Sequence, residues 1–249
     1  MFKRRLLKVS ALIVGITLIL CFAACSNGST GGDNNNNQTP STSAGAASLG
    51  ETLKLSGQVY LEEDVYADDS YTRYTGNLTV ISDGGGSGAI TNGRLDFTIG
   101  KPNQLEYLDL NEIFGDLEWI NLQATKNSVK YFLLDALYID DSIYGYECWL
   151  EKSTTSYTGN GWIYESVVYM YVEEDVNITG KGTTVNYTDD YVSEKEITND
   201  LSLALKKGWN ALYGKEVMSY DNPNYQTDTY TISLSNPTLR WVLVNYDGD

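Results

Sequence analysis

One short stretch has the residue types of a sugar-binding surface. Period-two alternation over residues 144–151 places Glu147, Trp149 and Glu151 on one face of a strand, and Cys148 with apolar residues on the other. An exposed indole stacks on the apolar face of a sugar ring, and carboxylates accept hydrogen bonds from sugar hydroxyls. An aromatic cross-strand pair that only stabilises the sheet, with Tyr169 or Tyr171 as the partner of Trp149, explains the same pattern. The sequence leaves both interpretations open.

Two groups of acidic residues have the composition of calcium-binding loops. The acids at 62–64, 68 and 69 form the first group, and Glu173, Glu174 and Asp175 form the second. Calcium takes about six to eight oxygen ligands from such loops. Neither group has EF-hand spacing, and solvated loops explain the same acids. We therefore expect no cofactor, with calcium as the one alternative.

Histidine is absent, which excludes several catalytic chemistries. None of the 249 residues is His, so Ser-His-Asp catalysis, Cys-His catalysis and histidine zinc sites are removed. A glycoside hydrolase needs only two carboxylates about 5–10 Å apart, one with a raised pKa. With 33 acidic residues, such a pair will occur by chance. A carboxylate-based hydrolase acting on polysaccharide is therefore an alternative for which no catalytic residue can be named.

The first 25 residues have the pattern of an export signal. Residues 1–8 carry four basic residues and no acid, residues 9–24 are apolar or small, and Cys25 follows Ala24. The apolar run of 16 residues is shorter than the ~20 that a spanning helix needs. This stretch resembles the lipobox of bacterial lipoproteins, although Phe22 stands where that family usually has leucine. The resemblance implies cleavage between Ala24 and Cys25, and lipidation of the Cys25 sulfur.

The resemblance also implies a location. Within that family, a residue other than aspartate after the cysteine, here Ser26, favours the outer membrane where the cell has one. Residues 26–49 are rich in Gly, Ser, Thr, Asn and Ala and contain no aromatic residue, so they cannot bury enough surface to fold. The expected organisation is a signal peptide at 1–24, a lipidated cysteine and linker at 25–50, and a β-rich ectodomain at 51–249. A division of that ectodomain near residue 102 is an alternative.

The charge balance bears on the partners of the processed chain. Removing residues 1–24 leaves 13 basic and 33 acidic residues, a net charge of −20. A nucleic-acid backbone would be repelled, so nucleic acid is excluded as a partner. Cys148 is then the one cysteine besides Cys25, so an intrachain disulfide would consume the lipidated sulfur. The ectodomain must therefore be stabilised by its core.

Strand patterns dominate the ectodomain. We count about ten to twelve strands with frequent turn signals and no alternation of strands with helices, which predicts an antiparallel β-sandwich or a partly closed barrel. Hairpins are expected around the Thr-Gly-Asn-Gly of residues 158–161 and between runs 201–205 and 209–217. The apolar run 129–139 is predicted as one central strand buried on both faces. Residues 104–122 indicate one short helix or a packed loop.

The function expected from these features is a binding or structural one. The chain would be a lipid-anchored cell-envelope protein whose ectodomain is a non-enzymatic module with a glycan or protein ligand. A calcium-stabilised adhesin-like domain and the hydrolase are the alternatives. Residues 172–180 and 205–210 resemble segments of secreted β-rich bacterial lipoproteins of unassigned function. That resemblance implies no activity.

Overall fold

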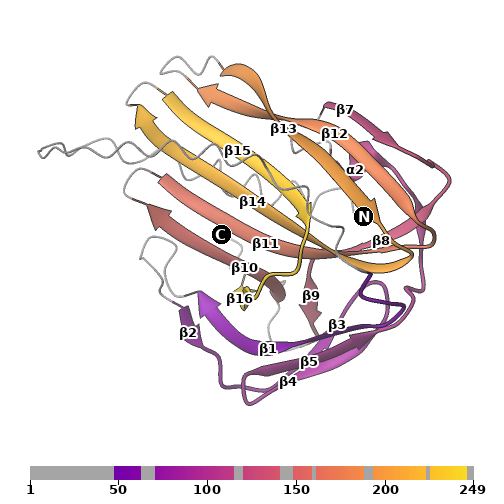
Figure 1. Ribbon diagram of the computed structural model, residues 1–249. Helices are drawn as coiled ribbons and strands as arrows, with labels where there is room; N and C mark the ends of the chain where they lie inside the picture. The colour runs from indigo at the N-terminus through magenta and orange to yellow at the C-terminus, as the bar shows by residue number, and fades with distance from the viewer. Residues whose placement is uncertain are drawn as a thin grey trace, which may run out of the picture. The chain divides into compact units, whose positions relative to one another are not determined.

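The described part of the chain is almost entirely strand. The computed structural model describes residues 48–62, 71–114, 120–140, 148–158, 161–187, 193–222 and 225–245. These residues form sixteen strands and one short helix (Figure 1). The predicted all-β, antiparallel sandwich class is confirmed. The count exceeds twelve because strands of two or three residues, such as β2, β6 and β9, are too short to show a period.

The elements follow one another along the chain with a single helix among them. Helix α2 (Leu110–Phe114) lies between β6 and β7, within the segment where a short helix was expected. The first nine strands are β1 (Leu53–Glu62), β2 (Tyr71–Arg73), β3 (Leu78–Ile81), β4 (Ser87–Thr91), β5 (Arg94–Ile99), β6 (Glu106–Tyr107), β7 (Ile120–Ala124), β8 (Lys130–Leu134) and β9 (Leu137–Ile139). The remaining strands are β10 (Cys148–Thr158), β11 (Gly161–Val172), β12 (Val176–Tyr187), β13 (Ser193–Leu205), β14 (Gly208–Asn222), β15 (Tyr225–Leu234) and β16 (Arg240–Asn245).

Seven strands close into a ring. Their order is β10-β16-β1-β5-β4-β3-β9, and β9 pairs back onto β10. The pair β1–β16 is parallel, and the other pairs of the ring are antiparallel. The β4–β5 hairpin turns at Asn92-Gly93, where both residues have positive φ, as a two-residue hairpin turn requires. Strands from both sides of residue 102 build this ring, and residues Gly45–Asp249 form one compact unit.

The second half of the chain builds a six-stranded sheet in the order β10-β11-β14-β15-β12-β13. At one end the sheet is a single layer, because β15 pairs with β12 through residues 184–187 and with β14. Toward the other end β12 leaves β15 and pairs with β7 through residues 178–181. The diverging strands form the two layers of the sandwich.

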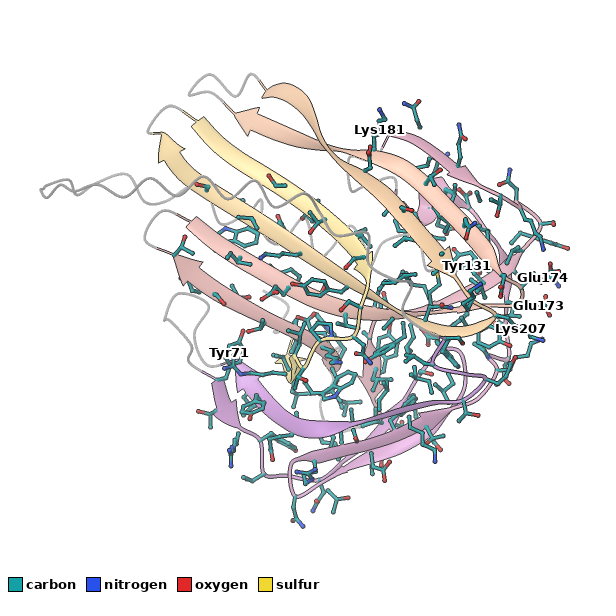
Figure 2. The ribbon with its side chains drawn as sticks, in the orientation of Figure 1. Tyr71, Tyr131, Glu173, Glu174, Lys181 and Lys207 are labelled. Atoms are coloured by element: carbon teal, nitrogen blue, oxygen red, sulfur yellow. The ribbon has the colours of Figure 1, made fainter. Side chains whose placement is uncertain are left out.

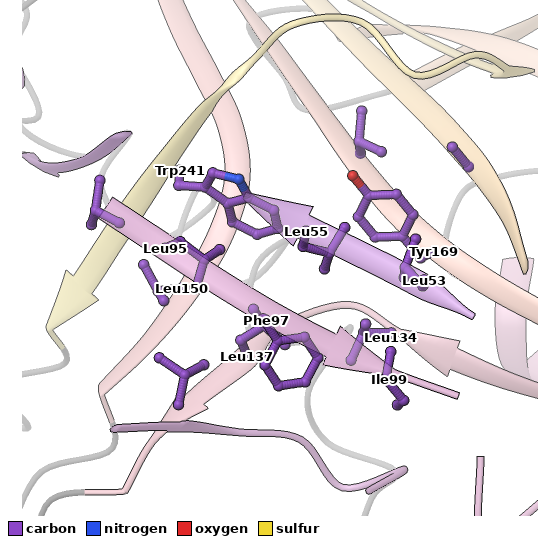
Figure 3. Packing of buried hydrophobic residues seen from close by; sticks show 14 of the residues in the cluster. Leu53, Leu55, Leu95, Phe97, Ile99, Leu134, Leu137, Leu150, Tyr169 and Trp241 are labelled. Carbon is purple, nitrogen blue, oxygen red and sulfur yellow. The ribbon is translucent and has the colours of Figure 1, made fainter. Parts of the chain in front are cut away.

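Two apolar cores result from this divergence. The ring core contains Phe97, Leu137, Leu150 and Trp241 (Figure 3), together with Trp209. The second core lies between the diverging layers and includes residues of β11, β12, β13, β14 and α2. Along β11, Tyr169 and Tyr171 belong to the ring core, whereas Met170 and Val172 belong to the second core. Each such fully buried apolar side chain contributes about 1.5–3 kcal/mol.

The prediction of one central strand over residues 129–139 is wrong. The run divides into β8 and β9 at Asp135-Ala136, and the two strands pair with different neighbours. Strand β8 pairs with β11, whereas β9 pairs with β10 and β3. The bend lets one apolar run fill the gap that opens where β10 and β11 separate.

The predicted hairpin between 201–205 and 209–217 is also wrong. Strand β13 pairs with β12, and β14 pairs with β11 and β15. The connection is a corner built around the buried side-chain amide of Asn210. That amide accepts from the Lys206 N–H at 3.0 Å and donates to the carbonyls of Lys206 at 2.7 Å and Gly208 at 2.9 Å. Local bonding therefore turns the chain between layers without pairing the two strands.

The hairpin predicted around residues 158–161 is confirmed. The β10–β11 ladder runs from Lys152↔Val167 to Thr158↔Gly161, which leaves two residues to connect the strands. Gly161 is required there, because a Cβ atom would lie 1.9 Å from the carbonyl oxygen of Met218.

Candidate ligand surface on the outer face of strand β10

Strand β10 presents alternate residues to the ring core and to its outer face. Leu150 is 0% exposed and belongs to the ring core. Trp149 and Glu151 therefore lie on the outer face, and both side chains are half-buried. The structure thus brings together two of the three residues that the sequence placed on one face. Glu147 and the side chain of Cys148 lie outside what the structure describes.

The Glu151 carboxylate is oriented by two hydroxyl groups. Ser153 Oγ donates to Glu151 Oε1 at 2.6 Å, and the Tyr164 hydroxyl donates to the same oxygen at 3.2 Å. Ser153 is 3% exposed. Burial, followed by the charge of Glu151, raises the pKa of the Tyr164 phenol well above its ordinary value, so the phenol remains a donor at neutral pH. The result is a preset acceptor whose other oxygen, Oε2, accepts no hydrogen bond from the described residues.

Trp149 lies in an apolar row that crosses four strands. Its register partners are Val244 on β16 and Tyr138 on β9, and Tyr138 pairs in turn with Ile81 on β3. Ile81 is 38% exposed, so the row reaches the surface at β3. The aromatic cross-strand pair expected as an alternative is therefore present, but its second member is Tyr138. The expected partners Tyr169 and Tyr171 belong to the ring core instead. Because Trp149 stays partly exposed, the pair does not remove it from contact with a ligand.

A second aromatic group lies at the far end of the same face. Tyr157 is 38% exposed and pairs with Trp162 across the β10–β11 ladder. Two residues along β11 from Trp162, Tyr164 pairs with Glu216 on β14, and Glu216 pairs with Tyr230 on β15. These residues were not predicted from the sequence to lie together on one face. The hairpin register at 158–161 would have placed Tyr157 beside Trp162. No local pattern indicates Tyr138, because its pairing with Trp149 depends on the closure of the ring.

The geometry of the two outer-face carboxylates bears on the hydrolase alternative. Glu151 and Glu216 are separated by two strand spacings and four residue steps, about 16 Å between Cα atoms. Glycoside hydrolases hold their two carboxyl groups about 5–9.5 Å apart. This pair therefore does not have the spacing that the reaction uses.

The acidic turn at 173–175 bonds to lysines from three other connections. Figure 2 shows Glu173 and Glu174 of this turn close to Lys207. Lys101 contacts Glu173 at 2.9 Å, Lys126 contacts Glu174 at 2.7 Å, and Lys206 contacts Asp175 at 2.9 Å. The three carboxylates thus have separate partners and do not converge on one point. Across the described ranges, no group of three or more metal-ligating side chains is found. The first acidic group lies outside those ranges beyond Glu62, which ends β1.

The proposed lipidation and cleavage residues, Cys25 and Ala24, lie outside the described residues. No helix in the described part of the chain has the length and apolarity of a membrane span. Comparisons of the chain with protein-family models, with curated proteins and with solved structures found no match.

Proposed function

We propose that this chain is a lipid-anchored cell-envelope protein whose β-sandwich ectodomain is a non-enzymatic glycan-binding module. The N-terminal pattern ending at Cys25 supports attachment through a lipid, and the polar composition of residues 26–49 supports display on a linker. The observation that carries the binding role is the outer face of β10. There, half-buried Trp149 lies next to the Glu151 carboxylate that Ser153 and Tyr164 orient.

This arrangement supplies the two interactions that a sugar requires. The indole of Trp149 offers an apolar surface to the C–H face of a ring. The Glu151 carboxylate offers an acceptor to a ring hydroxyl, and hydrogen bonds to charged groups are the stronger ones. Because two hydroxyl groups already hold the carboxylate, little side-chain entropy is lost when a ligand binds.

The test is a glycan panel probed with the full-length protein in detergent and with its Trp149→Ala variant. We expect at least one glycan to bind, and the variant to bind it about tenfold or more weakly, which is about 1.4 kcal/mol. Tyr107→Ala is the matched control, because Tyr107 is 65% exposed and lies on β6. Near-ultraviolet circular dichroism checks that both variants fold. Unchanged affinity of Trp149→Ala for every bound glycan would remove this surface from consideration, and a panel with no bound glycan would contradict the binding role.

A further inference from the structure

We infer that the ligand is an extended, uncharged polysaccharide chain that lies along strand β10 and contacts aromatic side chains at both ends of its outer face. This inference rests on the glycan-binding role proposed above. It adds the length, the direction and the charge of the ligand.

The two aromatic groups are too far apart for one sugar ring. Trp149 and Tyr157 are eight residues apart on the same strand and face, which is about 26 Å at the usual rise of a strand. Trp162 lies beside Tyr157 at the far end. A ligand that contacts both ends must therefore be a chain of several sugars.

Polar side chains occupy the outer face between the two ends. Glu151 and Thr155 are half-buried and alternate with the inner-face residues of β10. Ser153 is 3% exposed and acts by holding the Glu151 carboxylate together with Tyr164 of β11. Aromatic groups at the ends with hydroxyl and carboxylate groups between them match a chain that stacks some of its rings and hydrogen-bonds with others.

The charges near this face favour an uncharged chain. Half-buried Glu151 lies on it, and Glu216, which is 4% exposed, lies buried on the same side of the sheet. The whole chain has 33 acidic and 17 basic residues. The cation at its border is Arg240, the register partner of Ser153. Its guanidinium lies over the ring of Tyr71 at 4.6 Å and donates to Thr154 Oγ1 at 3.2 Å. A polyanionic chain would meet net repulsion here, and a neutral chain would not.

The experiment measures the affinity of the full-length protein for neutral polymers (hydroxyethyl cellulose, mannan, xylan and dextran) and for anionic polymers (alginate, polygalacturonate and hyaluronan). We expect binding to at least one neutral polymer and to none of the anionic ones, and at least 100-fold weaker binding of the disaccharide from the same polymer. Trp149→Ala and Trp162→Ala should each weaken polymer binding about tenfold. The double variant should lose about 100-fold, because effects at distant sites add.

The outcomes separate this inference from the proposed function. If Trp149→Ala weakens binding but Trp162→Ala and Tyr157→Ala do not, the binding role stands and the extended chain is wrong. Equal affinity for disaccharide and polymer, or tight binding of an anionic polymer, also overturns the inference. If no polymer binds, or Trp149→Ala has no effect, the surface and the inference both fail. Tyr157→Ala is included in case Trp162→Ala disturbs folding. Tyr157 is partly exposed, whereas Trp162 is half-buried.

Discussion

At the scale of single residues, Gly57 shows how closely the ring core is packed. It lies on β1, next to Trp241 of the parallel strand β16. A Cβ atom at Gly57 would lie 2.9 Å from Cδ1 of the buried Trp241 indole. Gly57→Ala should therefore lower the free energy of unfolding by about 1–3 kcal/mol, as overpacked core substitutions do. Urea unfolding of the full-length protein in detergent measures this change.

Gly100 provides the matched control for that substitution. A Cβ atom there would have no heavy atom within 4 Å. Gly100→Ala should change stability little, or increase it slightly by restricting the unfolded chain. Equal destabilisation by the two substitutions would show that the indole contact is not what limits residue 57.

At the scale of elements, the turn between β11 and β12 connects several loops at one end of the molecule. The hydrogen bond from Lys101 holds the pKa of Glu173 below its ordinary value, and the hydrogen bond from the Lys207 N–H does the same for Asp175. Lowered folded-state pKa values stabilise the fold, and this stabilisation is fully present above the unfolded values of 4.5 and 3.8. It is lost as the pH falls below those values and through the lower folded-state pKa values. Stability should therefore decrease below about pH 4.5, by a modest amount because both groups are exposed.

Substituting the lysines tests this pH dependence. A Lys101→Met/Lys206→Met double variant should be less stable than wild type at pH 7 and equal to it near pH 2.5, because protonated carboxyls no longer favour the lysines. Thermal unfolding across pH 2.5–7 measures the difference. Lys181→Met is the control, because Lys181 is exposed and makes no ion pair with another described residue. A constant difference between the double variant and wild type at all pH values would contradict the ion-pair explanation.

At the scale of the whole molecule, the described domain begins at a fixed point. The Leu49 N–H donates to the Trp209 carbonyl at 2.7 Å, and the Trp209 N–H donates to the Gly50 carbonyl at 2.8 Å. Ser48 Oγ also donates to the Lys207 carbonyl at 2.9 Å. Residues 48–50 are therefore bonded to the corner at 207–209. If the residues before them are the proposed linker, any force transmitted through it would reach the domain there.

The proposed lipid attachment leads to a prediction about the whole chain. Wild-type protein should fractionate with membranes and resist extraction by high salt, whereas Cys25→Ala should lose this attachment, because several acyl chains are needed for stable anchoring. Cys148→Ala is the control and should stay membrane-bound. Western blotting of the membrane and soluble fractions reads the outcome. A Cys25→Ala protein that remains in the membrane would show that the apolar leader is the anchor.

The fold class could be predicted from the amino-acid sequence alone, as could the faces of individual strands and several local turns. Alternation at 53–61 and 95–99 predicts the strands β1 and β5, and Gly-Asn-Gly predicts the β10–β11 hairpin. The period of two placed Trp149 and Glu151 on one face, because successive side chains of a strand point to opposite sides.

The neighbours of each strand could not be predicted from the sequence and are known only from the three-dimensional structure. A period of two identifies the buried face of a strand but carries no information about its pairing partner, which depends on contacts distant in sequence. For that reason the division of 129–139, the separation of β13 from β14 and the parallel β1–β16 pair had no sequence signal. The pairing of Trp149 with Tyr138 and the bond from Tyr164 to Glu151 depend on the same long-range pairing. The residues that β10 contributes to the candidate surface could therefore be predicted from the local sequence. The residues that other strands place beside them could not.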